Sequence, residues 1–412
     1  MELTIKKRRV KLIIAVIVML FAGIIYAWSI TNTPFRQISD GVVINATQLG
    51  INYTLTIVFF CLGGFGAGLI AKRTTPALRL VLSAMMLFTS FLAASLQTVT
   101  LGYTENYFML FLTYGVLGGL GIGMAYITII STVNMWFPDK RGFSSGIMLM
   151  GFGLSLLVIG WLIDMLGNTE SVGWRSTYVY IAIVLGLVFL VAAIFIRPPP
   201  KDAVFPSTKS DNADDNIKEQ RNYTALEMVC RPSFYLIFIF VTILAASGSA
   251  AISFARDIVS DAGASEGFAV IAVGLLGISN GLGRLAIGWL YDKQGIRPTQ
   301  LICSGVAIFA PLTVVMALMS NSLILGVLGL CLCGFSYGFA PTMNSVFASE
   351  FYGPKDFSLN FSILNLILIP APFAAFLAGG IKASTGGFMT AFIILTALTI
   401  VGFFINLAIR KP

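Results

Sequence analysis

Long apolar runs separated by short polar segments dominate the pattern of this chain. A run of about 20 apolar residues crosses the hydrocarbon core of a bilayer as a helix. The alternating segments of about ten residues that mark barrel strands are absent from the sequence. We therefore predict an all-α membrane protein with 12 transmembrane helices, over roughly residues 12–31, 50–71, 77–99, 107–133, 143–165, 175–196, 233–255, 267–290, 299–319, 322–347, 359–381 and 386–408.

The N-terminal segment is basic up to Lys11, and an apolar run follows it, as in a secretory signal peptide. The run continues to about Ile30, with no small-residue cleavage site before Thr31. A first transmembrane helix is therefore the better interpretation of this segment.

The longest polar stretch, Arg197 to Arg231, combines three consecutive prolines with mixed charge and is typical of a flexible linker. It predicts an N-terminal six-helix bundle over residues 1–196, a linker over 197–231 and a C-terminal six-helix bundle over 232–412. Similar loop sequences after spans four and ten indicate pseudo-symmetric halves. Such halves predict a substrate site at their interface near the bilayer midplane, with alternating access.

The distribution of Lys and Arg predicts the orientation of the chain. With the N-terminus inside, the inner segments hold 21 of the 26 cations and the outer segments hold 4. Since cytoplasmic loops carry the excess of Lys and Arg, both termini are predicted in the cytoplasm of a multi-pass cell-membrane protein. The net charge of +8 is thus explained by topology, and nucleic acid is not expected as a partner.

The composition argues against most other classes of function. Only 11% of residues are charged, against about 25% in soluble domains. The sequence has no histidine, and its five cysteines lack metal or disulfide spacing, so we predict no metal site, no cofactor and no enzymatic activity. A membrane enzyme would need a polar catalytic cluster, and a receptor would need a signalling domain larger than the linker.

Small residues and prolines predict local packing features. Glycines crowd spans two and four, where they permit close contact between helices. Pro370 and Pro372 are expected to interrupt span eleven, because proline removes a backbone hydrogen bond.

The segment from Gly288 to Arg297 reads G-W-L-Y-D-K-Q-G-I-R. It resembles the G-x-L-x-D-x-x-G-x-R loop signature of the major facilitator superfamily, which implies the major facilitator fold. The resemblance implies gating roles for Gly288, Asp292, Gly295 and Arg297. The corresponding loop after span two departs from the signature, because Lys72 stands in place of the Asp.

A closer resemblance, to the oxalate/formate antiporter group and related monocarboxylate transporters, rests on residues 134–146, which read N-M-W-F-P-D-K-R-G-F-S-S-G. It adds Asp139, Arg141 and Gly142 to the gating residues. Tyr26 with Trp28, Tyr126, Asn280 with Arg284, and Tyr337 before Pro341 also fit that pattern.

Arg284 is the cation that lies inside a predicted span. An Arg at the bilayer centre costs about 2.5 kcal/mol or more, so it needs a partner inside the protein. An interhelical ion pair is one interpretation, but Asp164, the acid within a span, lies near the outer end, whereas Arg284 lies near the inner end. The alternative is that the anion is the substrate, since a guanidinium donates two parallel hydrogen bonds to a carboxylate.

The remaining candidate residues refine the predicted substrate. Asn280 lies one helical turn before Arg284 on the same face. Tyr26, Tyr126 and Tyr337 carry hydroxyls at mid-span and serve either substrate binding or aromatic packing. The oxalate exchanger that this chain resembles has a Lys in span eleven, where Asn365 stands here. One cation balances one carboxylate, so we predict a monocarboxylate such as lactate, pyruvate or formate.

Two alternative transporters share this fold: an oxalate/formate-type dicarboxylate exchanger and a drug-efflux carrier. The efflux carrier would need an acid deep in the cavity, and none is present in the sequence pattern. The chain also has no histidine and no mid-span carboxylate to carry a proton, which favours anion exchange or facilitated diffusion over proton symport. Protons and a counter-anion both stay open as coupled ions. We expect a monomer in the lipid bilayer.

Overall fold

The computed structural model describes residues 2–31, 46–96, 103–167, 169, 172–200, 203, 205 and 221–412. Arg36, the end of the third expected span beyond residue 96, and most of the expected linker lie outside the described residues. Of Asp164, only the backbone is described.

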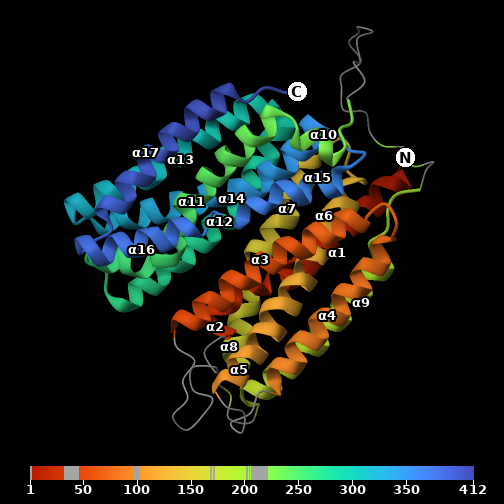
Figure 1. The fold of residues 1–412 in the computed structure, drawn as a ribbon, viewed down its shortest axis with the longest axis horizontal. Helices are drawn as coiled ribbons and strands as arrows, with labels where there is room; N and C mark the ends of the chain where they lie inside the picture. Colours follow the sequence, from red (N-terminus) through yellow and green to blue (C-terminus); the bar gives the residue numbers. More distant parts are fainter. Residues whose placement is uncertain are drawn as a thin grey trace. The chain divides into compact units, whose positions relative to one another are not determined.

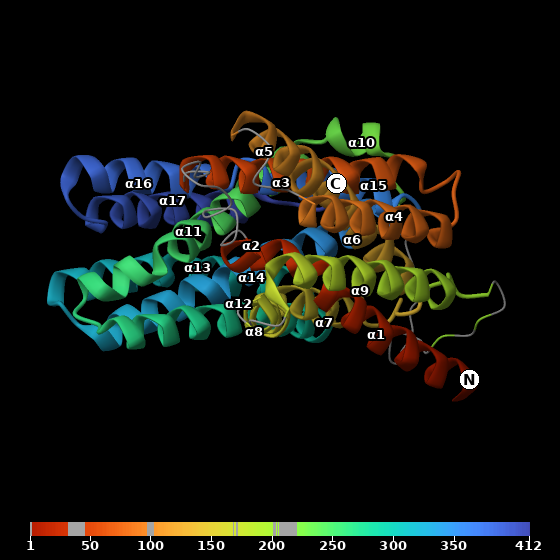
Figure 2. The same ribbon diagram turned by 90° about the horizontal axis from the view of Figure 1, so that it is seen from below.

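The described part of the chain is nearly all helical (Figures 1 and 2). Twelve stretches within it are long and apolar enough to cross a membrane, which confirms the predicted number of spans. The elements in chain order are α1 (Glu2–Ala22), η1 (Gly23–Ala27), α2 (Trp28–Thr31), α3 (Ala46–Ile70), α4 (Pro76–Ser95), α5 (Tyr103–Leu110), η3 (Phe111–Gly118), α6 (Gly119–Asn134), α7 (Arg141–Gly153), η4 (Leu156–Gly160), α8 (Trp161–Gly167), α9 (Gly173–Phe195), α10 (Ala225–Val229), α11 (Pro232–Asp261), α12 (Glu266–Gln294), α13 (Ile296–Ser320), α14 (Leu323–Tyr352), α15 (Phe357–Leu364), η5 (Asn365–Leu368), α16 (Phe373–Thr385) and α17 (Met389–Ala408).

The chain divides into two compact units. Unit 1 comprises Met1–Pro138 and Gly151–Phe205, and unit 2 comprises Asp139–Met150 and Pro206–Pro412. The chain passes from one unit to the other within α7, most of which packs in unit 2. The domain boundaries expected from the sequence place all of α7 in the N-terminal bundle, and they stay a prediction.

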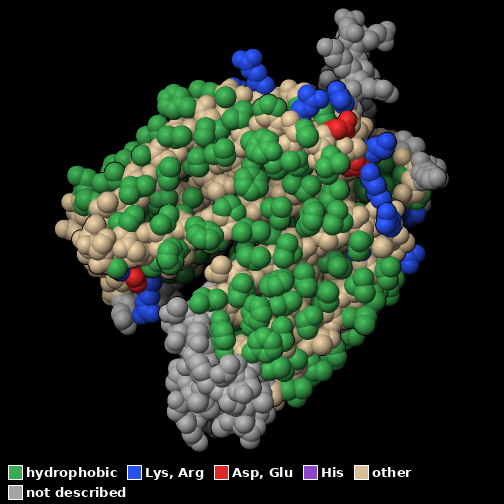
Figure 3. Space-filling view, viewed as in Figure 1, with side chains coloured by type: hydrophobic (Ala, Val, Ile, Leu, Met, Phe, Trp, Pro, Cys, Tyr) green, Lys and Arg blue, Asp and Glu red, His purple; other side chains and the backbone are tan. Residues whose placement is uncertain are grey.

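Large apolar side chains cover the outer faces of the helices. Figure 3 shows them in green along the helices of this face, with Lys and Arg side chains in blue near helix ends. Many of these residues are strongly exposed, including Ile13, Trp161, Leu282 and Phe404. A soluble protein rarely exposes so much contiguous apolar surface, whereas a lipid-facing surface requires it.

In unit 1, α6 packs against α3 through glycines. A Cβ added at Gly63 would lie 2.2 Å from the carbonyl oxygen of Leu120, and one added at Gly123 would lie 1.9 Å from that of Phe60. Neither distance is possible for a real side chain, so only glycine permits this backbone approach. The predicted close packing is confirmed for Gly63 of span two and Gly123 of span four, whereas a Cβ at Gly66 would meet no atom within 4 Å.

In unit 2, α14 is the central helix and packs against α11, α12 and α13. Its neighbours bury an apolar core that includes Val259, Leu276, Val314 and Phe392. The eleventh span is broken between α15 and α16, where η5 and a turn over 369–372 replace regular helix. The interruption predicted from Pro370 and Pro372 is therefore confirmed.

Candidate functional site

Arg284 lies on α12 with only 1% of its surface exposed. Its Nη1 donates to the carbonyl oxygen of Leu149 at 2.8 Å, and its Nε donates to Oδ1 of Asn280 at 3.3 Å. Both of these acceptors are neutral, so neither cancels the charge of the guanidinium. The bond to Asn280 joins residues one helical turn apart, as their spacing in the sequence predicts.

The backbone of α12 around Arg284 is held by close packing on two sides. A Cβ added at Gly338 of α14 would lie 2.3 Å from the carbonyl oxygen of Asn280, and one added at Gly146 of α7 would lie 2.6 Å from that of Arg284. Thr342 of α14 also donates its hydroxyl to the carbonyl oxygen of Arg284 at 3.3 Å. These contacts leave α12 little freedom to shift, and therefore fix the position of the guanidinium.

The other candidates in unit 2 occupy neighbouring elements. Tyr337 is half-buried on α14, where it packs directly against Gly248 of α11. Asn365 is buried at the start of η5, in the interrupted eleventh span. Their proposed roles in substrate binding stay predictions.

The tyrosines of unit 1 meet around one phenylalanine. Tyr26, half-buried in η1, packs edge-on against Phe152 with ring centroids 5.4 Å apart. Tyr126 is buried on α6 and packs against both Phe152 and Phe60 at 5.2 Å. The structure therefore brings Tyr26 and Tyr126 onto one aromatic cluster within unit 1, while Arg284, Asn280, Tyr337 and Asn365 belong to unit 2.

The gating candidates include a bonded pair at the start of α7. Asp292, near the end of α12, accepts the backbone N–H of Gly142 on Oδ1 at 2.9 Å and that of Phe143 on Oδ2 at 2.7 Å. A helix N-terminus has backbone donors without intrahelical acceptors and a partial positive charge, so a carboxylate there is doubly favourable. Asp139 and Arg141 lie half-buried beside this point, on either side of Lys140.

Two glycines bring α7 and α12 into backbone contact at the same place. A Cβ added at Gly288 would lie 2.1 Å from the carbonyl oxygen of Gly142, and one added at Gly142 would lie 2.4 Å from that of Gly288. We call this contact, together with the two bonds of Asp292, the α7–α12 junction. It unites three of the sequence-predicted gating residues.

The last two gating candidates form the turn after α12. Gly295 ends this helix with φ +80°, a conformation that other residues rarely adopt. Arg297 follows it and donates to the carbonyl oxygens of Asn406, Leu407 and Ile409 at 3.0–3.2 Å. Arg297 therefore holds the C-terminal end of α17, where helix carbonyls lack intrahelical donors.

Some partners of these residues carry no signal in the sequence. The carbonyl of Leu149 accepts from Arg284 as a main-chain group, so any residue type could stand there. Phe152 is one phenylalanine among 33.

Among the described residues, no group of three or more His, Cys, Asp or Glu side chains could hold a metal ion.

Comparisons with known proteins agree with this architecture. Residues 12–368 match the family model described as Major Facilitator Superfamily. The chain is 24% identical to the oxalate:formate antiporter of Oxalobacter formigenes over 395 residues, which cover 94% of this chain and 88% of that protein. It is 23% identical to human monocarboxylate transporter 12 over 332 residues, covering 74% of this chain and 63% of that protein.

Solved structures give the same fold. The structure of the proton:xylose symporter XylE matches with a TM-score of 0.73 and 14% identity, covering 98% of this chain and 96% of that one. The family model matches most of the chain, and 12 helical stretches of the described residues are long and apolar enough to span a membrane, so this protein belongs to the Major Facilitator Superfamily of membrane transporters.

Proposed function

We propose that this transporter carries a small monocarboxylate of the lactate, pyruvate or formate class, by alternating access, and that Arg284 binds the substrate carboxylate. The observation that carries the proposal is a fully buried guanidinium held in place by two neutral acceptors, Leu149 O and Asn280 Oδ1. A guanidinium has five N–H donors in a rigid plane, and its fork matches the two oxygens of a carboxylate. A guanidinium oriented in this way suits the recognition of a substrate carboxylate.

The relatives support a carboxylate as the cargo. The oxalate:formate antiporter, which aligns with 94% of this chain, carries two carboxylates, and monocarboxylate transporter 12 bears that class in its name. Between these, a monocarboxylate fits better, because a dianion in a low-dielectric site needs a second cation. Asn365 is neutral, and the sequence has no Lys or Arg between Lys355 and Lys382.

The α7–α12 junction is the proposed gate of this carrier. Asp292 binds the first turn of α7 through both carboxylate oxygens, while Leu149, further along α7, binds Arg284 of α12. A movement of α7 along α12 would therefore break bonds at the gate and at the proposed substrate anchor together. In this proposal, the position of the anchor would change together with the state of the gate.

The direct test is transport by Arg284 variants in proteoliposomes. We expect Arg284→Gln to reduce uptake of labelled lactate, pyruvate or formate by about 100-fold or more, because charged hydrogen bonds are worth about 1.5–3 kcal/mol each. Arg284→Lys should retain part of the activity, since it keeps the charge and loses the fork. Arg256→Gln, the same change at an exposed position of α11, is the matched control.

The same panel separates the alternatives. Oxalate uptake equal to that of formate would favour the dicarboxylate exchanger, and a requirement for internal anion or for a pH gradient would identify exchange or symport. Undiminished monocarboxylate uptake by a monodisperse Arg284→Gln protein would rule out the proposed anchor.

A further inference from the structure

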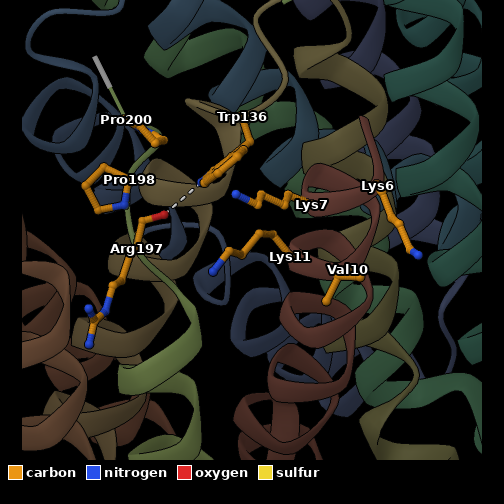
Figure 4. Close-up of a pocket in the computed structure, with 8 residues that line it drawn as sticks. All are labelled: Lys6, Lys7, Val10, Lys11, Trp136, Arg197, Pro198 and Pro200. Carbon is orange, nitrogen blue, oxygen red and sulfur yellow. Dashed lines mark hydrogen bonds between the residues drawn. The ribbon is translucent and has the colours of Figure 1, made fainter. Parts of the chain in front are cut away.

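A cavity of about 490 Å³ lies in unit 1, where α1 begins and α6 and α9 end (Figure 4). Four of its eight described lining residues are cations and none is an acid. The lining comprises Lys6, Lys7, Val10, Lys11, Trp136, Arg197, Pro198 and Pro200. None of these eight residues is among the proposed substrate-binding or gating residues.

Two bonds build the wall of this cavity. Trp136, only 4% exposed, donates its indole N–H to the carbonyl oxygen of Arg197 at 2.7 Å. Lys11 donates to the carbonyl oxygen of Phe195, and its Nζ lies 5.8 Å from the centroid of the Trp136 ring. The segment after α9 is therefore fixed beside α1.

Two of the four lining cations, Lys7 and Lys11, extend their amines into the same space. Figure 4 shows Lys7 and Lys11 pointing from α1 towards the segment that carries Arg197, whereas the amine of Lys6 and the guanidinium of Arg197 point away from this space. Like charges this close repel one another, and a bound anion would relieve that repulsion. Lys and Arg donors of this kind suit the oxygens of a phosphate group.

Exposed apolar strips lead from the cavity along two adjacent spans. On α1, Val10 lines the cavity and is 47% exposed, and Ile13 and Ile17 follow on the same face at 60% and 50%. On α9, a strip of Leu187, Val191 and Ile194 ends one turn before the cavity, and each residue is 48–60% exposed. The spacing of three or four residues places each strip on one face of its helix.

We propose that this cavity binds the phosphate of an anionic phospholipid, with the acyl chains of the lipid lying along the α1 and α9 strips. The cavity lies at the ends of membrane-spanning helices, which is the level of lipid headgroups. A soluble phosphate shares the headgroup chemistry but would make no use of the apolar strips. The lipid would tie the start of α1 to the end of α9, and so brace one end of unit 1.

The test is a binding titration of the full-length purified protein with four probes: dihexanoyl phosphatidylglycerol, dihexanoyl phosphatidylcholine, glycerol 3-phosphate and inorganic phosphate. We expect saturable binding of the phosphatidylglycerol alone. Each Lys or Arg near an anionic lipid surface contributes about fivefold in affinity. The double variant Lys7→Gln/Arg197→Gln should therefore lose roughly 25-fold.

A matched control removes two cations outside the cavity. Arg9→Gln/Arg73→Gln changes the net charge equally at exposed positions and should bind as the parent does. The conservative variant Lys7→Arg/Arg197→Lys keeps both charges and should retain binding, which separates lost charge from lost folding. Equal binding of phosphatidylglycerol and phosphatidylcholine, or equal losses in both double variants, would overturn the site. Binding of the soluble phosphates as tight as that of the lipid would overturn the lipid as its ligand.

Discussion

At the scale of single residues, Arg284 and Asp292 show how main-chain groups position charged side chains. The guanidinium of Arg284 donates to a carbonyl of α7, and the carboxylate of Asp292 accepts two N–H groups from the start of the same helix. The two residues lie on α12 about two helical turns apart. The positive side chain on α12 therefore binds a carbonyl of α7, and the negative side chain binds two N–H groups of α7.

The carboxylate of Asp292 should contribute measurably to the stability of unit 2. Asp292→Asn removes the charge and leaves only one oxygen to accept from Gly142 or Phe143. We expect a loss of about 1 kcal/mol, the typical value of a helix N-terminal cap, because one backbone donor loses its acceptor. The measurement is the thermal unfolding midpoint of the detergent-purified protein.

Asp257→Asn provides the comparison for this change. Asp257 pairs with Lys382 at 2.9 Å, but its side chain is 48% exposed, and an exposed pair contributes little. We expect the thermal unfolding midpoint of Asp257→Asn to stay close to that of the parent protein. Equal shifts for the two variants would argue against the capping role of Asp292.

At the scale of elements, hydropathy predicts where helices cross the membrane but not where their hydrogen-bond pattern changes. Pro370 and Pro372 predict the break before α16 from the sequence. The π-helical segments η3 (Phe111–Gly118) and η4 (Leu156–Gly160) contain no proline and look like ordinary apolar sequence. Their hydrogen-bond pattern depends on packing against neighbouring helices, and one sequence alone does not contain that information.

The α7–α12 junction depends on an element-scale feature, the absence of a side chain at Gly288. Gly288→Ala would place a Cβ 2.1 Å from the carbonyl oxygen of Gly142, so the two helices must separate. We expect a loss of about 1–3 kcal/mol, as for other overpacked sites, with reduced transport because the bonds of Asp292 lie beside this contact. Thermal unfolding and uptake are measured together.

The same substitution elsewhere on α12 should have the opposite effect. A Cβ at Gly274 would meet no atom within 4 Å. Alanine also favours helix over glycine by up to about 1 kcal/mol, so Gly274→Ala should be neutral or stabilising. Parent-like behaviour of Gly288→Ala would show that the junction tolerates separation and is not a tight contact.

At the scale of the whole molecule, the apolar pattern is sufficient to predict the class and the number of spans, because lipid imposes one strong rule on every crossing segment. The candidate site is predicted less completely. Asn280 and Arg284 follow from their i, i+4 spacing, and Asp292 follows from the loop signature. The carbonyl of Leu149 and the ring of Phe152 become partners only through tertiary packing. The orientation of the chain in its membrane rests on the Lys and Arg distribution alone.

That orientation can be tested with a native cysteine. Cys230 is exposed just before α11, on the side predicted to be cytoplasmic, whereas Cys61, Cys303 and Cys333 are buried. In intact cells, a membrane-impermeant maleimide should leave Cys230 unmodified and should label it only after permeabilisation. The Cys230→Ser variant should give no such labelling, which shows that the signal comes from Cys230.

Adding Ser384→Cys to that variant places a thiol at the exposed end of α16, on the side predicted to be outside. This variant should be labelled in intact cells. The reverse result at both positions would place the termini outside, because residues 230 and 384 would have exchanged sides, and the charge asymmetry would then need another explanation.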